Sequence, residues 1–128
     1  MIVAGIGCRR GAPADAILAA ITAALTRSGL GREALHSIAT STTKGGEPGI
    51  ADAASALGVP LVLVAQPDLE AAAHRTTTRS ERVIALTGVP SVAEAAALAA
   101  GGAAARLVAP RVAVGPATCA LAVSGDAT

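Results

Sequence analysis

The chain of 128 residues contains no phenylalanine, tyrosine or tryptophan. It therefore lacks the aromatic platforms on which single-stranded nucleic acids and flat apolar cofactors usually stack. Charge is also scarce, because only 15% of the residues are charged and ten Lys and Arg against nine Asp and Glu leave a net charge of +1. No overall basic field attracts nucleic acid or an anionic membrane. A charged ligand must be bound by a local group of residues.

Long apolar runs and paired cysteines are missing as well. The longest stretch without a charge, residues 53–67, is interrupted by Gly58 and Pro60, whereas a membrane span needs about 20 apolar residues. The N-terminus has neither a basic segment nor a long apolar one, so we expect a cytoplasmic protein. Cys8 and Cys119 lie far apart without CxxC spacing or a nearby histidine. This argues against a disulfide and against a metal site, and we expect two reduced thiols.

The apolar pattern predicts a single α/β domain over residues 1–128. Strands are expected over residues 2–8, 36–41 and 61–65, and each is followed by a helix, over about 13–28, 48–57 and 67–73. This alternation favours right-handed crossovers and a mainly parallel sheet flanked by helices. The uninterrupted apolar run of the third strand is typical of a strand covered on both faces.

The last part of the chain predicts a different arrangement. Polar residues 74–82 are interpreted as a loop and residues 83–86 as a short strand. Ser91 and Glu94 have the capping-box spacing that starts a helix running to about residue 100. Three strands joined by tight turns are expected over residues 106–109, 111–114 and 118–123. The sheet is therefore expected to be mixed, with antiparallel C-terminal strands.

Loops after the strands are the expected binding site, because open sheets bind ligands at the carboxyl ends of their strands. Arg9, Arg10 and Lys44 fall in two of these loops. The helices that begin there add backbone N–H donors and partial positive charge, so we expect an anion-binding pocket. The candidate ligand-binding residues are Gly7, Cys8, Arg9, Arg10, Gly11, Thr42, Lys44, Glu47, Gly88 and Ser91.

The glycines from Gly5 to Gly11 allow a second interpretation. Their GxGxxxG spacing resembles the phosphate loop of NADP-type nucleotide-binding domains. The acidic residue that would bind a ribose hydroxyl is missing, although Ser41, Thr42 and Lys44 could accept a 2′-phosphate. The alternative is that the glycines only form a tight turn.

No catalytic constellation is visible, so we assign no catalytic residue and no cofactor. His36 and His74 lack a Ser-His-Asp or His-carboxylate spacing and are interpreted as surface or capping residues. The neighbouring arginines would favour a thiolate at Cys8, whereas the alternative is a small buried thiol at a strand end. Glu47 either orients a ligand or stabilises a helix start, and Glu94 is assigned to the capping box.

Five segments, in this order, carry a recognisable pattern: GIGCRRG at 5–11, KGGEPGI at 44–50, GVPL at 58–61, GVPSVAEAAAL at 88–98 and ATCALA at 117–122. They resemble the CobE proteins of cobalamin (vitamin B12) biosynthesis, which are similar to the C-terminal domain of CbiG. The resemblance implies binding of a precorrin or corrinoid tetrapyrrole, whose carboxylates suit Arg9, Arg10 and Lys44. CbiG-type proteins open a lactone ring, but they carry N-terminal regions that this sequence does not have, so that activity is not transferred.

Three functions remain open on this basis. The chain is either an accessory or carrier protein for a precorrin, or an enzyme acting on one. As a third alternative, the alanine-rich helix at 91–100 is a docking face for other enzymes of the pathway. A homo-oligomer would bury further apolar surface, but the sequence does not demand one.

Overall fold

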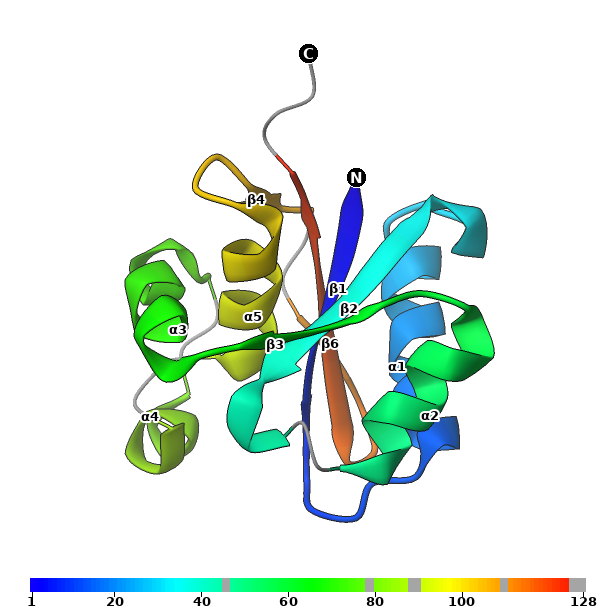
Figure 1. Ribbon diagram of the computed structural model, residues 1–128, viewed down its shortest axis with the longest axis horizontal. Coiled ribbons are helices and arrows are strands. Elements are labelled where there is room, and N and C mark those ends of the chain that lie inside the picture. The colour runs from blue at the N-terminus through cyan, green and yellow to red at the C-terminus, as the bar shows by residue number, and fades with distance from the viewer. Residues whose placement is uncertain (45–46, 78–79, 88–90, 109–110, 125–128) are drawn as a thin grey trace.

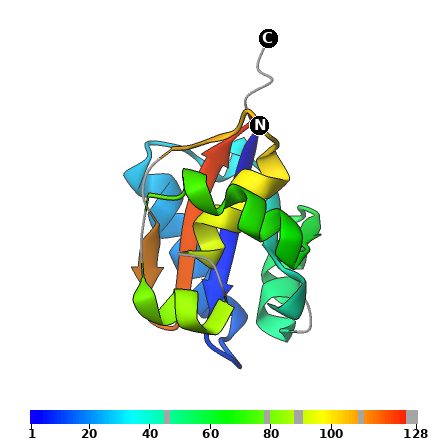
Figure 2. The same ribbon diagram turned by 90° about the vertical axis from the view of Figure 1, so that its left-hand side faces the viewer.

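The sheet is mixed and lies between two layers of helices (Figure 1). The computed structural model describes residues 1–44, 47–77, 80–87, 91–108 and 111–124. Within them, six strands follow the order β3-β2-β1-β6-β4, and β5 also pairs with β6. Helices α1 and α2 cover one face of the sheet, and α3 and α5 cover the other, as Figure 2 shows from the α3 and α5 side. The predicted fold class is confirmed.

The first half of the chain builds the parallel part of the sheet. Its elements are β1 (Ile2–Cys8), α1 (Ala14–Arg27), a 3-10 turn (Arg32–Ala34), β2 (Leu35–Ser41), a second turn (Thr42–Lys44), α2 (Pro48–Leu57), β3 (Leu61–Val64), α3 (Gln66–Ala72) and a third turn (Ala73–Arg75). Strand β2 pairs in parallel with β1 and with β3. Pro48 begins α2 and Gly58, with a φ of +69°, ends it, so the predicted helix at 48–57 is confirmed.

The second half of the chain adds the antiparallel part. Its elements are α4 (Glu81–Thr87), α5 (Val92–Gly101), β4 (Arg106–Leu107), β5 (Val112–Val114) and β6 (Ala117–Val123). Strand β6 lies antiparallel to β1 over its whole length, from Ile2 opposite Val123 to Cys8 opposite Ala117. Strands β4 and β5 pair antiparallel with β6. The antiparallel end of the sheet was therefore predicted correctly.

Two local predictions are wrong. Residues 83–86 belong to helix α4 and not to a strand, because Ser80 begins the helix. Its Oγ accepts a hydrogen bond from Val83 N at 3.3 Å and its carbonyl accepts one from Ile84 N at 2.9 Å. Strand β3 is an edge strand and is not covered on both faces, since Leu63 is 48% exposed. An apolar run of four residues does not by itself distinguish an edge strand from a central one.

The two faces of the sheet bury different side chains. The α1 and α2 face buries isoleucines and leucines, whereas α5 contributes mainly alanines. Helix α5 can approach closely because Gly5 has no side chain: a Cβ at this position would overlap the carbonyl oxygen of Ala93 and lie 2.7 Å from Ala97 N. Residues 93–98 of α5 are all buried. The alanine-rich face proposed above for docking is therefore covered by the chain itself.

None of the described helices is long and apolar enough to cross a membrane.

Candidate functional site

Two loops meet at the carboxyl ends of β1 and β2. Residues 9–13 follow β1, and residues 42–44 and 47 lie between β2 and α2. The Glu47 carboxylate accepts a hydrogen bond from Gly11 N at 3.0 Å, and Gly11 has a φ of +77° that favours glycine. Gly49, in the first turn of α2, lies so close to the first loop that a Cβ would overlap the carbonyl oxygen of Ala12. The two loops are therefore held together as one surface.

The arginines of the first loop are the cations of this surface. Arg9 and Arg10 are both exposed, and within the described residues neither guanidinium has a hydrogen-bond or ion-pair partner. The backbone beneath them is anchored, because Arg9 N donates to Pro116 O at 2.9 Å and Ala12 N donates to Arg9 O at 3.1 Å. Two free guanidinium groups on an anchored loop can bind carboxylates in a forked geometry.

The second loop begins with a 3-10 turn at the end of β2. Thr42 is exposed and Lys44 ends the 3-10 turn that follows β2, so both lie at the predicted edge. Ser41 Oγ and Thr43 Oγ1 are 2.8 Å apart and share a hydrogen bond, which orders the start of this turn. Gly88 lies outside the described residues. The structure therefore brings the predicted residues Arg9, Arg10, Gly11 and Glu47 to one end of the sheet. Thr42 and Lys44 follow β2 at the same end.

Other predicted site residues have packing roles. Gly7 lies inside β1, where a Cβ would be 2.8 Å from Thr118 Oγ1 and 3.7 Å from Ala93 N. The absence of a side chain at Gly5 and Gly7 thus allows α5 and β6 to pack closely against β1. Of the three glycines of the GxGxxxG pattern, only Gly11 lies in a turn. Dinucleotide binding is therefore not supported by this GxGxxxG spacing, because its first two glycines do not form a phosphate loop.

Ser91 and Cys8 also contribute to packing. Ser91 is fully buried, and its Oγ accepts a hydrogen bond from Glu94 N at 3.2 Å. The structure assigns this hydroxyl to the cap of α5 and not to the surface of the pocket. Cys8 is partly exposed and packs against the core on the α1 side. Burial raises the pKa of the Cys119 thiol to about 12, so this second thiol is held in its neutral form.

Two threonines that the sequence did not single out also stabilise the edge. Thr40 Oγ1 donates to Ile6 O at 2.8 Å, and Thr118 Oγ1 donates to Gly7 O at 3.0 Å. Both hydroxyls bond carbonyl groups in the last part of β1, from the strands on either side. The available signal was a threonine inside a buried strand, where a hydroxyl needs a hydrogen-bond partner.

Glu94 was predicted only as part of a capping box, but its side chain also accepts hydrogen bonds from two distant segments. Its side chain is fully buried. One carboxylate oxygen accepts from Thr77 N at 2.9 Å, and the other accepts from Thr77 Oγ1 at 3.1 Å and from Arg111 N at 3.1 Å. A buried carboxylate requires such donors. Glu94 therefore joins the beginning of α5 to the segment before α4 and to the segment before β5.

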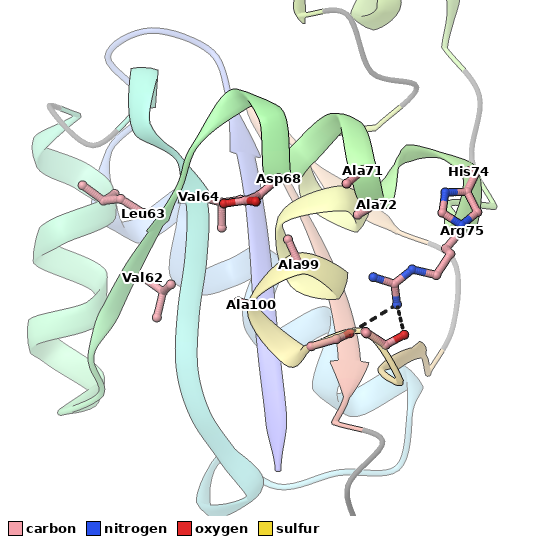
Figure 3. Close-up of a pocket in the computed structure, with 12 residues that line it drawn as sticks. Val62, Leu63, Val64, Asp68, Ala71, Ala72, His74, Arg75, Ala99 and Ala100 are labelled. Carbon is pink, nitrogen blue, oxygen red and sulfur yellow. Dashed lines mark hydrogen bonds between the residues drawn. The ribbon is translucent and has the colours of Figure 1, made fainter.

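A groove of about 600 Å³ lies elsewhere, between β3, α3 and the C-terminal half of α5 (Figure 3). Arg75 crosses its end, and its guanidinium donates to the carbonyls of Gly102 and Ala103 at 3.3 and 3.2 Å. Asp68 and His74 are its other ionisable residues. The groove is lined by Val62, Leu63, Val64, Asp68, Ala71, Ala72, His74, Arg75, Ala99, Ala100, Gly102 and Ala103. None of the predicted ligand-binding residues lines it, so the cationic edge and the groove are separate features.

Comparison with known proteins identifies the family. The family described as cobalamin synthesis G C-terminus matches residues 2–122. The chain belongs to this family. Protein CobE of Sinorhizobium sp is 38% identical over 127 residues, which cover 99% of this chain and 81% of that protein. The predicted resemblance is confirmed. As a member of this family, the chain is a protein of the cobalamin biosynthesis pathway.

Solved structures of the family agree with the fold. The crystal structure of CobE, a protein from the cobalamin biosynthetic pathway, has a TM-score of 0.90 and 34% identity, and the match covers 95% of this chain and 89% of that one. The cobalamin biosynthesis protein chiG from Agrobacterium tumefaciens str. C58 has a TM-score of 0.79 and 50% identity, with 98% and 100% of the two chains covered. The three-layer arrangement is thus shared within the family.

Proposed function

We propose that this chain binds a precorrin or corrinoid tetrapyrrole as an accessory or carrier protein. The ligand's carboxylates would contact the surface formed by residues 9–13, 42–44 and 47. One observation carries the proposal: Arg9 and Arg10 are exposed and unpartnered within the described residues, on a loop that Glu47 anchors through Gly11 N. Family membership supplies the pathway in which such a ligand occurs.

The chemistry of the ligand matches this surface. Precorrin-type intermediates carry several acetate and propionate side chains, and a guanidinium binds a carboxylate through two parallel N–H donors. A loop that is already ordered loses less conformational freedom on binding than a free one. Because the net charge of the chain is only +1, attraction to a polyanionic ligand must come from local groups such as Arg9 and Arg10. These two residues are therefore expected to contribute most of the electrostatic binding.

A binding role agrees better with the described site than a catalytic one does. The Glu47 carboxylate, which lies in the loop next to the arginines, accepts a hydrogen bond from the backbone N–H of Gly11. Its role is therefore to hold the loop. His36 lies at the start of β2 and His74 in the turn after α3, so neither stands next to Cys8 at the end of β1. Neither histidine is therefore placed to act as a base toward the Cys8 thiol.

A titration followed by visible absorbance tests the proposal. The purified protein is mixed with hydrogenobyrinic acid, and separately with earlier precorrins, and is then passed over a gel-filtration column with mass analysis of the bound pigment. Comigration of unaltered pigment supports a carrier or accessory role. A change in pigment mass would make the chain an enzyme and direct attention to Cys8 and Glu47. Absence of comigration with every intermediate would refute tetrapyrrole binding.

A further inference from the structure

Strand β3 leaves an apolar edge open to solvent. Within the described residues it pairs only with β2. Val62 is 36% exposed and Leu63 is 48% exposed, and only Met1 and Val108 are comparable among the large apolar side chains of the described chain. The whole stretch from residue 53 to 67 carries no charge. Natural edge strands are usually protected by charges, bulges or covering segments, and β3 itself carries no charged side chain.

The backbone of β3 shows which hydrogen-bonding groups are available. Ile38 N donates to Pro60 O at 3.0 Å, so the Pro60 carbonyl points toward β2. Backbone groups alternate between the two sides of a strand. The N–H and C=O groups of Val62 therefore also point toward β2, and those of Leu61 and Leu63 point outward. Within the part of the chain that the structure describes, Leu61 and Leu63 each keep an unpaired backbone N–H and C=O on this side. These groups can form one half of an antiparallel ladder.

We propose that β3 pairs with β3 of a second copy of this chain, antiparallel and about a two-fold axis that passes beside Val62. Leu61 then exchanges both backbone hydrogen bonds with the partner's Leu63, and the symmetric pair does the same. All four outward groups are satisfied in this register. Val62 lies opposite the partner's Val62 in the close, non-hydrogen-bonded position, with both side chains on the same face of the continued sheet.

The ends of β3 support this register. Pro60 has no N–H to donate, and the Ala65 carbonyl already accepts from Asp68 N and Leu69 N at the start of α3. Pairing is thus limited to the stretch between these two residues, in which Leu61–Leu63 is self-complementary about Val62. A two-fold partner presents the same patch, so two apolar edges meet and no like charges face each other within the strand pair.

The neighbouring groove provides additional apolar surface. A pair of four-residue strands alone buries less than the roughly 800 Å² per partner of a standard interface. Val62 and Val64 lie on the same side of β3 and line the groove of about 600 Å³ beside α3 and α5 (Figure 3). In the proposed dimer both grooves lie on the same face of the continued sheet, one on each side of the axis. Side chains of either copy can then extend the contact beyond the strands.

A charge exchange on the axis tests the proposal. Sedimentation velocity is measured over a range of concentrations for the native chain, for Val62→Lys and for Val62→Glu. The native chain is expected to dimerise, and each variant alone to need at least about tenfold more protein for the same dimer fraction, because like charges face each other. An equimolar mixture of the two variants is expected to recover dimers. A native chain that stays monomeric, or a dimer that both variants leave unchanged, would overturn the proposal.

Two controls separate this interface from other effects. Val108→Lys places the same charge on another exposed apolar residue and is expected to leave dimerisation unchanged. Val62→Cys, combined with Cys8→Ser, is expected to form an intermolecular disulfide on mild oxidation, since Cα atoms in this position are about 4.5 Å apart; absence of the crosslink would reject this register. Far-UV circular dichroism checks that each variant is folded. No tetrapyrrole is present, so the result does not depend on the proposed function.

Discussion

The Glu47 carboxylate accepts a hydrogen bond from the backbone N–H of Gly11 at 3.0 Å. This contact joins two loops that follow different strands of the sheet. It also places one carboxylate beside the exposed cations Arg9 and Arg10 without neutralising either of them through an ion pair. Glu47 thus acts on the candidate site through the backbone that carries the arginines.

Replacing Glu47 tests this anchoring role. Glu47→Ala is expected to lower the free energy of unfolding by about 1 kcal/mol, because the partly exposed hydrogen bond is lost. It is also expected to weaken tetrapyrrole binding, because the arginine loop is less ordered. Glu47→Gln keeps an acceptor oxygen and should retain binding. Amide hydrogen exchange at Gly11 provides the specific readout, and equal exchange rates in Glu47→Ala and the native chain would exclude the anchor.

Removing the two arginines tests the binding surface itself. The double variant Arg9→Ala, Arg10→Ala is expected to bind hydrogenobyrinic acid at least about tenfold more weakly, since exposed charge pairs contribute modestly but two forked contacts are lost. Binding by the native chain should also weaken with salt more steeply than binding by the variant. Both are measured by visible-absorbance titration at several salt concentrations.

A matched control removes the same charge from the opposite edge of the sheet. Arg32 and Arg106 are exposed and lie near the amino end of β1, because Leu35 and Val123 both pair with Ile2. Arg32→Ala with Arg106→Ala should leave the affinity unchanged. If both double variants weaken binding equally, the effect comes from net charge and the proposed surface is wrong.

The sequence predicted the parts of the structure that depend on local patterns. Pro48 and Gly58 delimit α2. The loops predicted after the first two strands correctly placed Arg9, Arg10, Gly11 and Glu47 at one end of the sheet. Nothing local distinguished β3 as an edge strand, because its position depends on how the other strands order themselves. Likewise, the β-branched residues of 83–86 suggested a strand, whereas Ser80 capped a helix there.

The partners of Glu94 could not have been predicted either. Thr77 and Arg111 each lie 17 residues from it in the chain, on opposite sides. The Ser91–Glu94 spacing correctly identified the start of a helix, since spacing reports local backbone geometry. Which distant backbone groups donate to the Glu94 carboxylate depends on tertiary packing, and this cannot be inferred from one sequence.

Close packing of α5 makes a glycine substitution in β1 costly. At Gly5 an added Cβ meets the backbone of Ala93 and Ala97, which cannot move without displacing α5. Gly5→Ala is therefore expected to destabilise the fold by about 3 kcal/mol or more. Gly7→Ala meets first the Thr118 hydroxyl, which can rotate away, so its cost should be about 1 kcal/mol. Urea unfolding followed by far-UV circular dichroism measures both, and equal losses would contradict the proposed close approach of α5.

Truncating Glu94 should loosen two distant segments together. Glu94→Ala leaves Thr77 N and Arg111 N without their buried acceptor, and a loss of about 3 kcal/mol is expected. The specific signature is faster amide exchange at both residues. Glu33→Ala, on an exposed carboxylate of the turn before β2, is the control and should change neither rate. Exchange that rises at only one of the two amides would show that Glu94 does not couple the segments.

Burial of Cys119 makes stability depend on pH in the alkaline range. The pKa of its thiol rises from 9.0 to about 12 in the folded chain. Above pH 9 the unfolded chain loses this proton while the folded chain keeps it, so stability is fully present below pH 9 and falls as the pH rises toward 12. The slope approaches about 1.4 kcal/mol per pH unit. Urea unfolding of the native chain and of Cys119→Ala over this range isolates the contribution, because other titrating groups are common to both.

Thiol chemistry provides an independent check on the same residue. At pH 8 iodoacetamide should modify Cys8, which is partly exposed, whereas Cys119 is fully buried and should react only when the chain unfolds. Adding urea should therefore raise the number of modified cysteines at the same concentration at which circular dichroism reports unfolding. If Cys119 reacts in the folded chain as fast as Cys8, the pairing of β6 with β1 and β5 around Cys119 must open without global unfolding. In that case the thiol is less well buried, and the loss of stability at alkaline pH should be smaller.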